Sequence, residues 1–247
     1  DSMQRGKPRN GWWLPLIMLV WVNLHGAYIA GIVTWGLYGF GLAWDRLWFK
    51  SPETKTLPAS FWRWYILGGV AAILITLANP NGLGLWNNSL GFLSNNFLVN
   101  HTDEYVAPDF HNPDHWSFLV YIVLLVIALG LRKDRVGVEH LAPSAAWLAM
   151  SLYSVRNIPL FVIIAAPLLA GSLENILLRY SGSPLVRWIL QRDENLNKTN
   201  STAKGVLWPV ITMVAVVAGL SLGVRLDKDQ IGNNFDPNKF QPKYYIM

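Results

Sequence analysis

Long uncharged apolar stretches, separated by short charged blocks, constrain this chain more than any other feature of its sequence. Three stretches, at 62–78, 116–131 and 206–224, each have about the length of one helical bilayer crossing, which needs about 20 residues. Only 14% of the 247 residues are charged, whereas soluble domains average about 25%. Thirteen tryptophans and nine tyrosines suit the two interfaces of a bilayer. The pattern excludes a soluble enzyme, a disordered tail and a coiled coil, and predicts a polytopic helical membrane protein.

Two longer apolar stretches, 12–43 and 141–171, are each interrupted near the middle by polar or helix-breaking residues. The interruption is Asn-Leu-His-Gly at 23–26 in the first and Arg-Asn-Ile-Pro at 156–159 in the second. Each stretch is too long for one straight crossing and short for two full ones. We therefore expect two tight helical hairpins, or pairs of half-helices, whose polar turns are covered by protein or face a wet cavity.

The distribution of charge predicts which loops lie inside the cell. Fifteen of the 20 Lys and Arg residues lie in four blocks, at 1–11, 44–63, 132–140 and 172–205. The connection at 79–115 has no Lys or Arg but carries four acidic residues. Basic loops are cytoplasmic by the positive-inside rule, so 79–115 should be external. This holds only if each long stretch crosses twice, which gives seven crossings in the plasma membrane of a bacterium.

The predicted architecture is an all-α transmembrane bundle over 1–224 with an extramembrane tail at 225–247. The tail would lie outside, although Arg225 and Lys228 oppose that side. The loop at 79–115 opens with a turn signature, Asn-Pro-Asn-Gly. Its next residues, 83–99, are uncharged and predict an interfacial amphipathic helix. The apolar positions of that helix are Trp86, Leu90, Leu93 and Phe97.

Arg156 is the most informative candidate for a functional role, because charges at membrane depth usually face a cavity or a partner. Its planar fork suits phosphate or carboxylate, which favours a clamp on an anionic substrate such as a lipid phosphate. The alternative is a turn arginine that reaches the interface or pairs with Glu104 or Asp109 to hold the bundle together. Both interpretations stay open on the sequence alone.

Two further polar groups are candidates for a substrate site. His25 could donate, accept or shuttle a proton beside Asn23, or both residues could cap broken helix ends. Glu104 and Asp109, with an imidazole at His111, could do acid–base chemistry, hold a divalent cation or contact a sugar. The spacing matches no known metal motif, and such residues are also typical of any external turn. The chain has no Cys, so it has no disulfide or thiolate site.

Taken in order, four motifs resemble the membrane part of GT-C-type glycosyltransferases, which use polyprenyl-phosphate sugars. The motifs are Trp-Val-Asn-Leu-His-Gly at 21–26, Asn-Pro-Asn-Gly at 79–82, Glu-Tyr with Pro-Asp-Phe-His over 104–111, and Arg-Asn-Ile-Pro-Leu-Phe at 156–161. A fifth, Asn-Phe-Asp-Pro at 234–237 followed by Phe240, lies near the end. The resemblance implies action at the external membrane face. The residues it would place around the lipid phosphate and the acceptor are Asn23, His25, Glu104, Asp109, Arg156 and Asn157.

The resemblance assigns no catalytic residue to this chain. Members of the group carry their catalytic acid in a first external loop near their N-terminus, which we expect to precede Asp1 in a longer protein. The tail at 225–247 resembles the point where such proteins enter a soluble external domain. Expected partners are membrane lipids and the lipid-linked sugar, with no metal assigned beyond the open question of a divalent cation.

Two other functions remain open. A non-catalytic membrane subunit that scaffolds a larger complex, such as an energy-transducing one, would also suit the Trp-rich helices and would have other membrane subunits as partners. A transporter is the third hypothesis, because paired broken helices can mark substrate sites. The charge pattern does not fit a nucleic-acid-binding face.

Overall fold

The computed structural model describes residues 8–50, 57–95, 103–202 and 206–226, and this part of the chain contains α-helices, short helical turns and no strand. The predicted all-α class is therefore confirmed. Contacts divide the chain into two compact units, residues 1–178 and 179–247. Each unit is described by itself.

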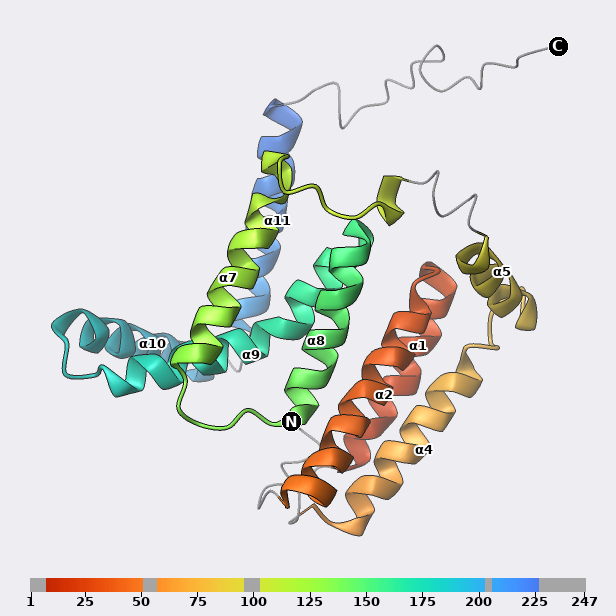
Figure 1. Cartoon of the computed structure of the whole chain (residues 1–247), viewed down its shortest axis with the longest axis horizontal. Helices are drawn as coiled ribbons and strands as arrows, with labels where there is room; N and C mark the ends of the chain where they lie inside the picture. Colours follow the sequence, from red (N-terminus) through yellow and green to blue (C-terminus); the bar gives the residue numbers. More distant parts are fainter. Residues whose placement is uncertain (1–7, 51–56, 96–102, 203–205, 227–247) are drawn as a thin grey trace. The chain divides into compact units, whose positions relative to one another are not determined.

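Three neighbouring helices form one side of the first unit: α1 (Trp13–Leu24), α2 (Tyr28–Trp44) and α4 (Ala59–Ile75) (Figure 1). Their shared core contains Met18, Val22, Tyr28 and Ala72, all at most 5% exposed. Gly69 allows α4 to approach α2 closely, because a Cβ at this position would overlap the ring of Trp35. The Tyr65 hydroxyl donates to the carbonyl of Trp35 at 2.5 Å and joins the same two helices.

A second group of helices packs around α9 (Ile158–Arg179). Phe161 of α9 is fully buried and meets the rings of Phe118 and Tyr121 from α7 (Trp116–Leu131) edge to face. The hydroxyl of Tyr121 also donates to the carbonyl of Val162 at 3.0 Å. Trp147, from α8 (Val138–Tyr153), is 5% exposed and completes this core.

Helices α2 and α8 join the two groups. Gly41 lies against the backbone at the start of α8, where a Cβ would overlap the main chain of Val138 and Glu139. Further along the same contact, the indole of Trp147 donates to the hydroxyl of Thr34 at 3.0 Å. Close backbone packing through glycine is typical of helix pairs in membranes.

Helix breaks occur at both interruptions predicted from the sequence. Helix α1 ends at Leu24 and α2 begins at Tyr28, while α8 ends at Tyr153 and is followed by a single helical turn, η5 (Val155–Asn157), before α9. Pro159 is the second residue of α9, where its missing N–H leaves no helical bond unmade. The loop helix also forms, as α5 (Leu83–Ser94); Phe97 lies outside the described residues.

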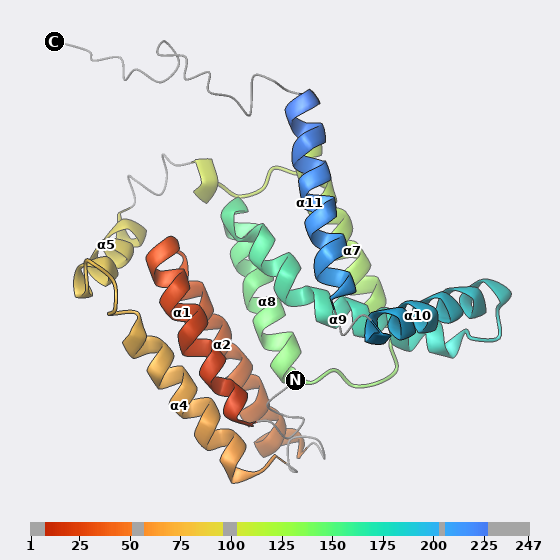
Figure 2. The same ribbon diagram turned by 180° about the vertical axis from the view of Figure 1, so that it is seen from behind.

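The turns of the first unit gather at two opposite ends, which Figures 1 and 2 show from two sides. One end, here called the acidic end, holds the turns at 25–27, 76–82 and 154–157 together with the loop at 103–115, which carries Glu104, Asp109 and Asp114. The other, here called the basic end, holds the turns at 45–58 and 132–137. Its basic residues are Arg46, Lys50, Arg132, Lys133 and Arg135. This segregation matches the expected external and cytoplasmic sides.

The second unit contains α10 (Pro184–Thr202) and α11 (Leu207–Leu226). Helix α10 was not expected, because the sequence analysis treated 172–205 as a cytoplasmic loop without regular structure. Its polar composition hid the helix from a search for apolar runs. Helix α11 agrees closely with the apolar stretch predicted at 206–224.

Among the described residues, two helices are long and apolar enough to cross a bilayer: Pro113–Leu131 and Val155–Arg179. Large apolar side chains along both lie on the surface of the unit, such as Val126 at 60% and Ile163 at 69% exposed. Soluble proteins rarely expose continuous apolar faces of this kind. The composition supports membrane association of the chain.

Candidate functional site

Arg156 contacts the external loop directly. Its Nη1 donates to Glu104 Oε2 at 3.1 Å and to the Tyr105 hydroxyl at 3.0 Å. The guanidinium carbon lies 5.3 Å from the centroid of the Tyr105 ring, in cation–π range. A residue of the turn before α9 thus binds two residues of the short helical turn η3 (Asp103–Tyr105).

The backbone around Arg156 is tied to the same loop by two further bonds. The N–H of Val155 donates to the carbonyl of Val106 at 3.0 Å, and the buried Ser154 hydroxyl donates to the carbonyl of Glu104 at 2.8 Å. Asn157, next along the turn, donates through Nδ2 to the carbonyl of Met150 at 3.0 Å and satisfies the open end of α8. These bonds fix the base of the arginine while its head remains at the surface.

The pairing leaves part of the arginine fork unused. Both recorded bonds start from Nη1, and no described residue accepts from Nε or Nη2. The Arg156 side chain is 34% exposed and that of Glu104 is 65% exposed. Arginine has five N–H donors in a planar fork, so the remaining edge can bind an anion without displacing Glu104.

Asn23 and His25 lie at the same end but bond locally. The Asn23 amide donates to the carbonyls of Leu19 at 2.8 Å and Ala78 at 3.0 Å, which ties the end of α1 to the segment after α4. His25 accepts the N–H of Ala27 at Nδ1, at 3.0 Å. Both contacts are the helix-end satisfaction that the sequence analysis gave as the alternative to a substrate role. His25 is exposed, and no described contact joins it to Glu104 or Arg156.

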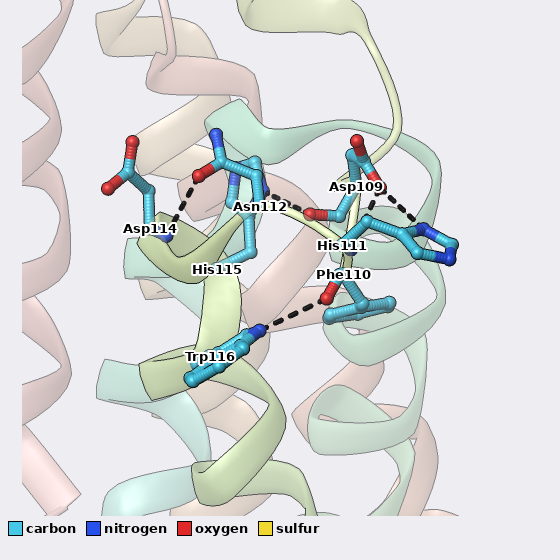
Figure 3. Close-up of polar contacts among 7 residues, drawn as sticks. All are labelled: Asp109, Phe110, His111, Asn112, Asp114, His115 and Trp116. Carbon is cyan, nitrogen blue, oxygen red and sulfur yellow. Dashed lines mark hydrogen bonds and ion pairs between the residues drawn. The ribbon is translucent and has the colours of Figure 1, made fainter.

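Asp109 organises its own loop (Figure 3). Its carboxylate accepts the N–H of His111 at 2.9 Å and lies 3.1 Å from the same residue's Nδ1. Its carbonyl contacts Nδ1 of His115 at 2.9 Å. The backbone and side-chain hydrogen bonds from His111 lower the pKa of the Asp109 carboxyl below its ordinary value of 3.8, so it is ionised at neutral pH.

The indole of Trp116 anchors this loop to α7 by donating to the carbonyl of Phe110 at 3.1 Å (Figure 3). Asn112 caps the turn before α7, η4 (Pro113–His115), by accepting the N–H of Asp114 at 3.1 Å. Within the described residues no three His, Asp or Glu side chains come together as a metal site would require. The contacts of Asp109 are those of a structured external turn.

The structure therefore brings Arg156, Glu104 and Asn157 into one cluster and leaves Asp109, Asn23 and His25 in separate local networks. Sequence reasoning missed Tyr105, whose ring also packs against Phe92 of α5 at 5.4 Å between centroids. Its position directly after Glu104 was the available signal, because an aromatic ring beside an acid can stack on an arginine paired to that acid.

No family model matches the chain, and no curated protein or solved structure is significantly similar to it. The resemblance to GT-C-type enzymes therefore stays a prediction from the motifs.

Proposed function

We propose that this chain is the membrane part of a GT-C-like glycosyltransferase that binds a polyprenyl-phosphate sugar at its external face. One observation carries the proposal: at the acidic end, an arginine is held by its backbone and by Glu104 with one edge of its fork unused. A monoanionic or dianionic lipid phosphate offers several acceptor oxygens to such an edge. The seven-crossing topology would put this edge at the outer membrane–water interface.

The roles of the other candidates follow from their distance in the network to Arg156. Glu104 and Tyr105 would hold the guanidinium plane, and Asn157 would keep the turn before α9 in place. Asp109, ionised and exposed, would contact hydroxyl groups of the sugar or acceptor, with Asn23 and His25 on the opposite rim. We assign substrate binding, and no catalytic acid, to these residues.

The topology behind the proposal uses short helices. Helix α1 has 12 residues and α8 has 16, or about 18 and 24 Å at 1.5 Å per residue. The hydrocarbon core is about 30 Å thick. Each hairpin would therefore bring its polar turn below the outer headgroups, where a lipid phosphate can meet Arg156.

The test is binding of a polyprenyl monophosphate to the full chain in lipid nanodiscs. Exchange of Arg156→Lys keeps the charge but removes the planar fork, and should weaken binding about tenfold or more. The matched control is Arg63→Lys, an exposed arginine in the first turns of α4 at the basic end, which should bind as the parent does. The free polyprenol, which lacks the phosphate, should bind every variant equally weakly.

The Arg156–Glu104 ion pair also supports a second function. A scaffold subunit would use the pair to fasten the external loop to α8 and α9, and would need no unused fork edge. Under that function Arg156→Lys would bind polyprenyl phosphate as the parent does, and the chain would purify in fixed stoichiometry with other membrane subunits.

Glu104→Gln separates the two functions. It removes the negative charge beside the fork, so a phosphate-binding site should keep or strengthen its affinity for the anionic lipid. A scaffold contact should instead loosen, and protease should cut the loop around residues 104–111 faster. Unchanged phosphate binding in Arg156→Lys with intact folding would overturn the glycosyltransferase proposal.

A further inference from the structure

Helix α10 (Pro184–Thr202) has two halves of different chemistry. The first half, Pro-Leu-Val-Arg-Trp-Ile-Leu-Gln-Arg, is apolar and basic, whereas the second contains mostly Asp, Glu, Asn, Lys and Thr. Leu185 and Trp188 of the first half are 66% and 55% exposed. An isolated polar helix has no reason to present a tryptophan and a leucine to water.

The apolar residues of α10 also share one face. At 3.6 residues per turn, Leu185, Trp188, Ile189 and Leu196 fall on one side, together with Arg192. The opposite side is polar throughout and carries Arg187, Gln191, Glu194 and Lys198. On that side Lys198 Nζ lies 2.7 Å from Glu194 Oε1, and the lysine lowers the pKa of this carboxyl.

Two arginines pair with aromatic rings around the apolar half. The guanidinium carbon of Arg192 lies 5.3 Å from the ring centroid of Trp188, and that of Arg179 lies 5.5 Å from the ring centroid of Tyr180. Residues 175–192 contain three arginines and no acid. Aromatic rings with adjacent cations are typical of the headgroup layer of a membrane, where the ring is half-immersed and the cation meets phosphate.

The chain holds α10 near a membrane surface. Helix α9, part of a segment long and apolar enough to cross a bilayer, ends at Arg179, four residues before α10 begins. Four residues span at most about 14 Å when extended. The start of α10 must therefore lie close to the point where that segment would leave the bilayer.

We propose that the first half of α10 lies in the membrane surface and that Arg192 and Arg179 bind anionic phospholipid headgroups. Charge complementarity selects this occupant: the apolar face is flanked by cations, and the two acids of the helix, Asp193 and Glu194, contact Asn197 and Lys198. Basic amphipathic helices of this composition bind anionic leaflets. The inference is independent of what the acidic end binds.

The absence of Cys from the sequence gives a direct test on the full chain. Single cysteines at Leu185, on the apolar face, and at Gln191, on the polar face, are labelled with an environment-sensitive fluorophore. The protein is placed in nanodiscs of phosphatidylcholine alone or with phosphatidylglycerol. We expect a blue-shifted label, quenched by lipid-attached quenchers, at 185 only, and a stronger effect with phosphatidylglycerol.

Charge variants in the Leu185→Cys background test the headgroup contact. Arg192→Gln should lower the ratio of lipid-buried to water-exposed label about fivefold in phosphatidylglycerol discs, the effect of one basic residue at an anionic surface. Arg187→Gln removes the same charge from the opposite face and should have a much smaller effect. High salt should reduce the difference between the two lipid compositions.

Three outcomes would overturn the proposal. Labels at 185 and 191 could be equally exposed to water in both lipids. The label at 185 could be shielded to the same degree in detergent and in both discs, which would indicate a protein contact instead. Finally, Arg187→Gln could match Arg192→Gln, which would show a general effect of net charge and no oriented face.

Discussion

At the level of single residues, Asp45 is a carboxylate buried among cations at the basic end, with 1% of its surface exposed. Its Oδ1 pairs with Nη2 of Arg135, and its Oδ2 accepts the N–H of Val138 at 2.6 Å. Val138 is the first residue of α8, so the negative charge also lies at the positive end of that helix. One side chain from the end of α2 thereby fixes the start of α8.

Exchange of Asp45→Asn keeps the shape of this side chain but removes its charge. We expect the free energy of unfolding to fall by about 1–2 kcal/mol, because a buried charge-assisted bond is lost while Arg135 stays about half-exposed and can be solvated. Thermal unfolding in detergent micelles measures the change. Asp114→Asn, an exposed acid in the external loop, is the control and should change stability by less than about 0.5 kcal/mol.

Equal losses in the two variants would show that burial of Asp45 contributes nothing beyond the loss of one negative charge. Sequence reasoning did not find this pair. An acid within a basic block looks like an ordinary loop charge, and its partner is 90 positions away in the chain. Only the crossing of α2 and α8 brings Asp45 to Arg135.

At the level of elements, the crossing of α2 and α8 depends on Gly41. The position leaves no room for a Cβ against the backbone of Val138 and Glu139. Gly36, in the same helix, has no atom within 4 Å of where its Cβ would be. The two glycines are therefore a matched pair with opposite expectations.

We expect Gly41→Ala to lower the free energy of unfolding by about 2 kcal/mol or more, because α2 and α8 must separate to admit the methyl group. Gly36→Ala should be neutral or stabilising by up to about 1 kcal/mol, since alanine has the higher helix propensity. Thermal unfolding of both variants under the same conditions is the measurement. A neutral Gly41→Ala would mean that the two helices do not pack at this distance.

Helix existence and helix ends were predictable where apolar length or a helix-breaking residue marks them. Pro159 and the Asn-Leu-His-Gly turn gave the two hairpin breaks, and the uncharged loop at 83–99 gave α5. Helix α10 was not predictable from apolar runs, because its second half is polar and its stability comes from local pairs such as Glu194 with Lys198. Of the candidate site, only the pairing of Arg156 with Glu104 was foreseen, as the alternative to a substrate clamp.

At the level of the whole molecule, the proposed function depends on which side of the membrane the acidic end faces. Gly26, Tyr153 and His111 are exposed positions that sample the two hairpin turns and the external loop, and Lys133 samples the basic end. Each can be changed to cysteine one at a time in a chain without any other. We expect a membrane-impermeant maleimide to label the first three in intact cells and Lys133→Cys only after permeabilisation.

The two hairpin positions decide the outcome. The seven-crossing topology requires Gly26→Cys and Tyr153→Cys to react from the same side as His111→Cys, because α1 with α2 and α8 with α9 must each turn back at the outer leaflet. If either were reached only from the cytosol, Arg156 could not meet a lipid phosphate beside Glu104 on the external face. The basic end would then face outward against the distribution of its arginines and lysines, and the glycosyltransferase proposal would have to be given up.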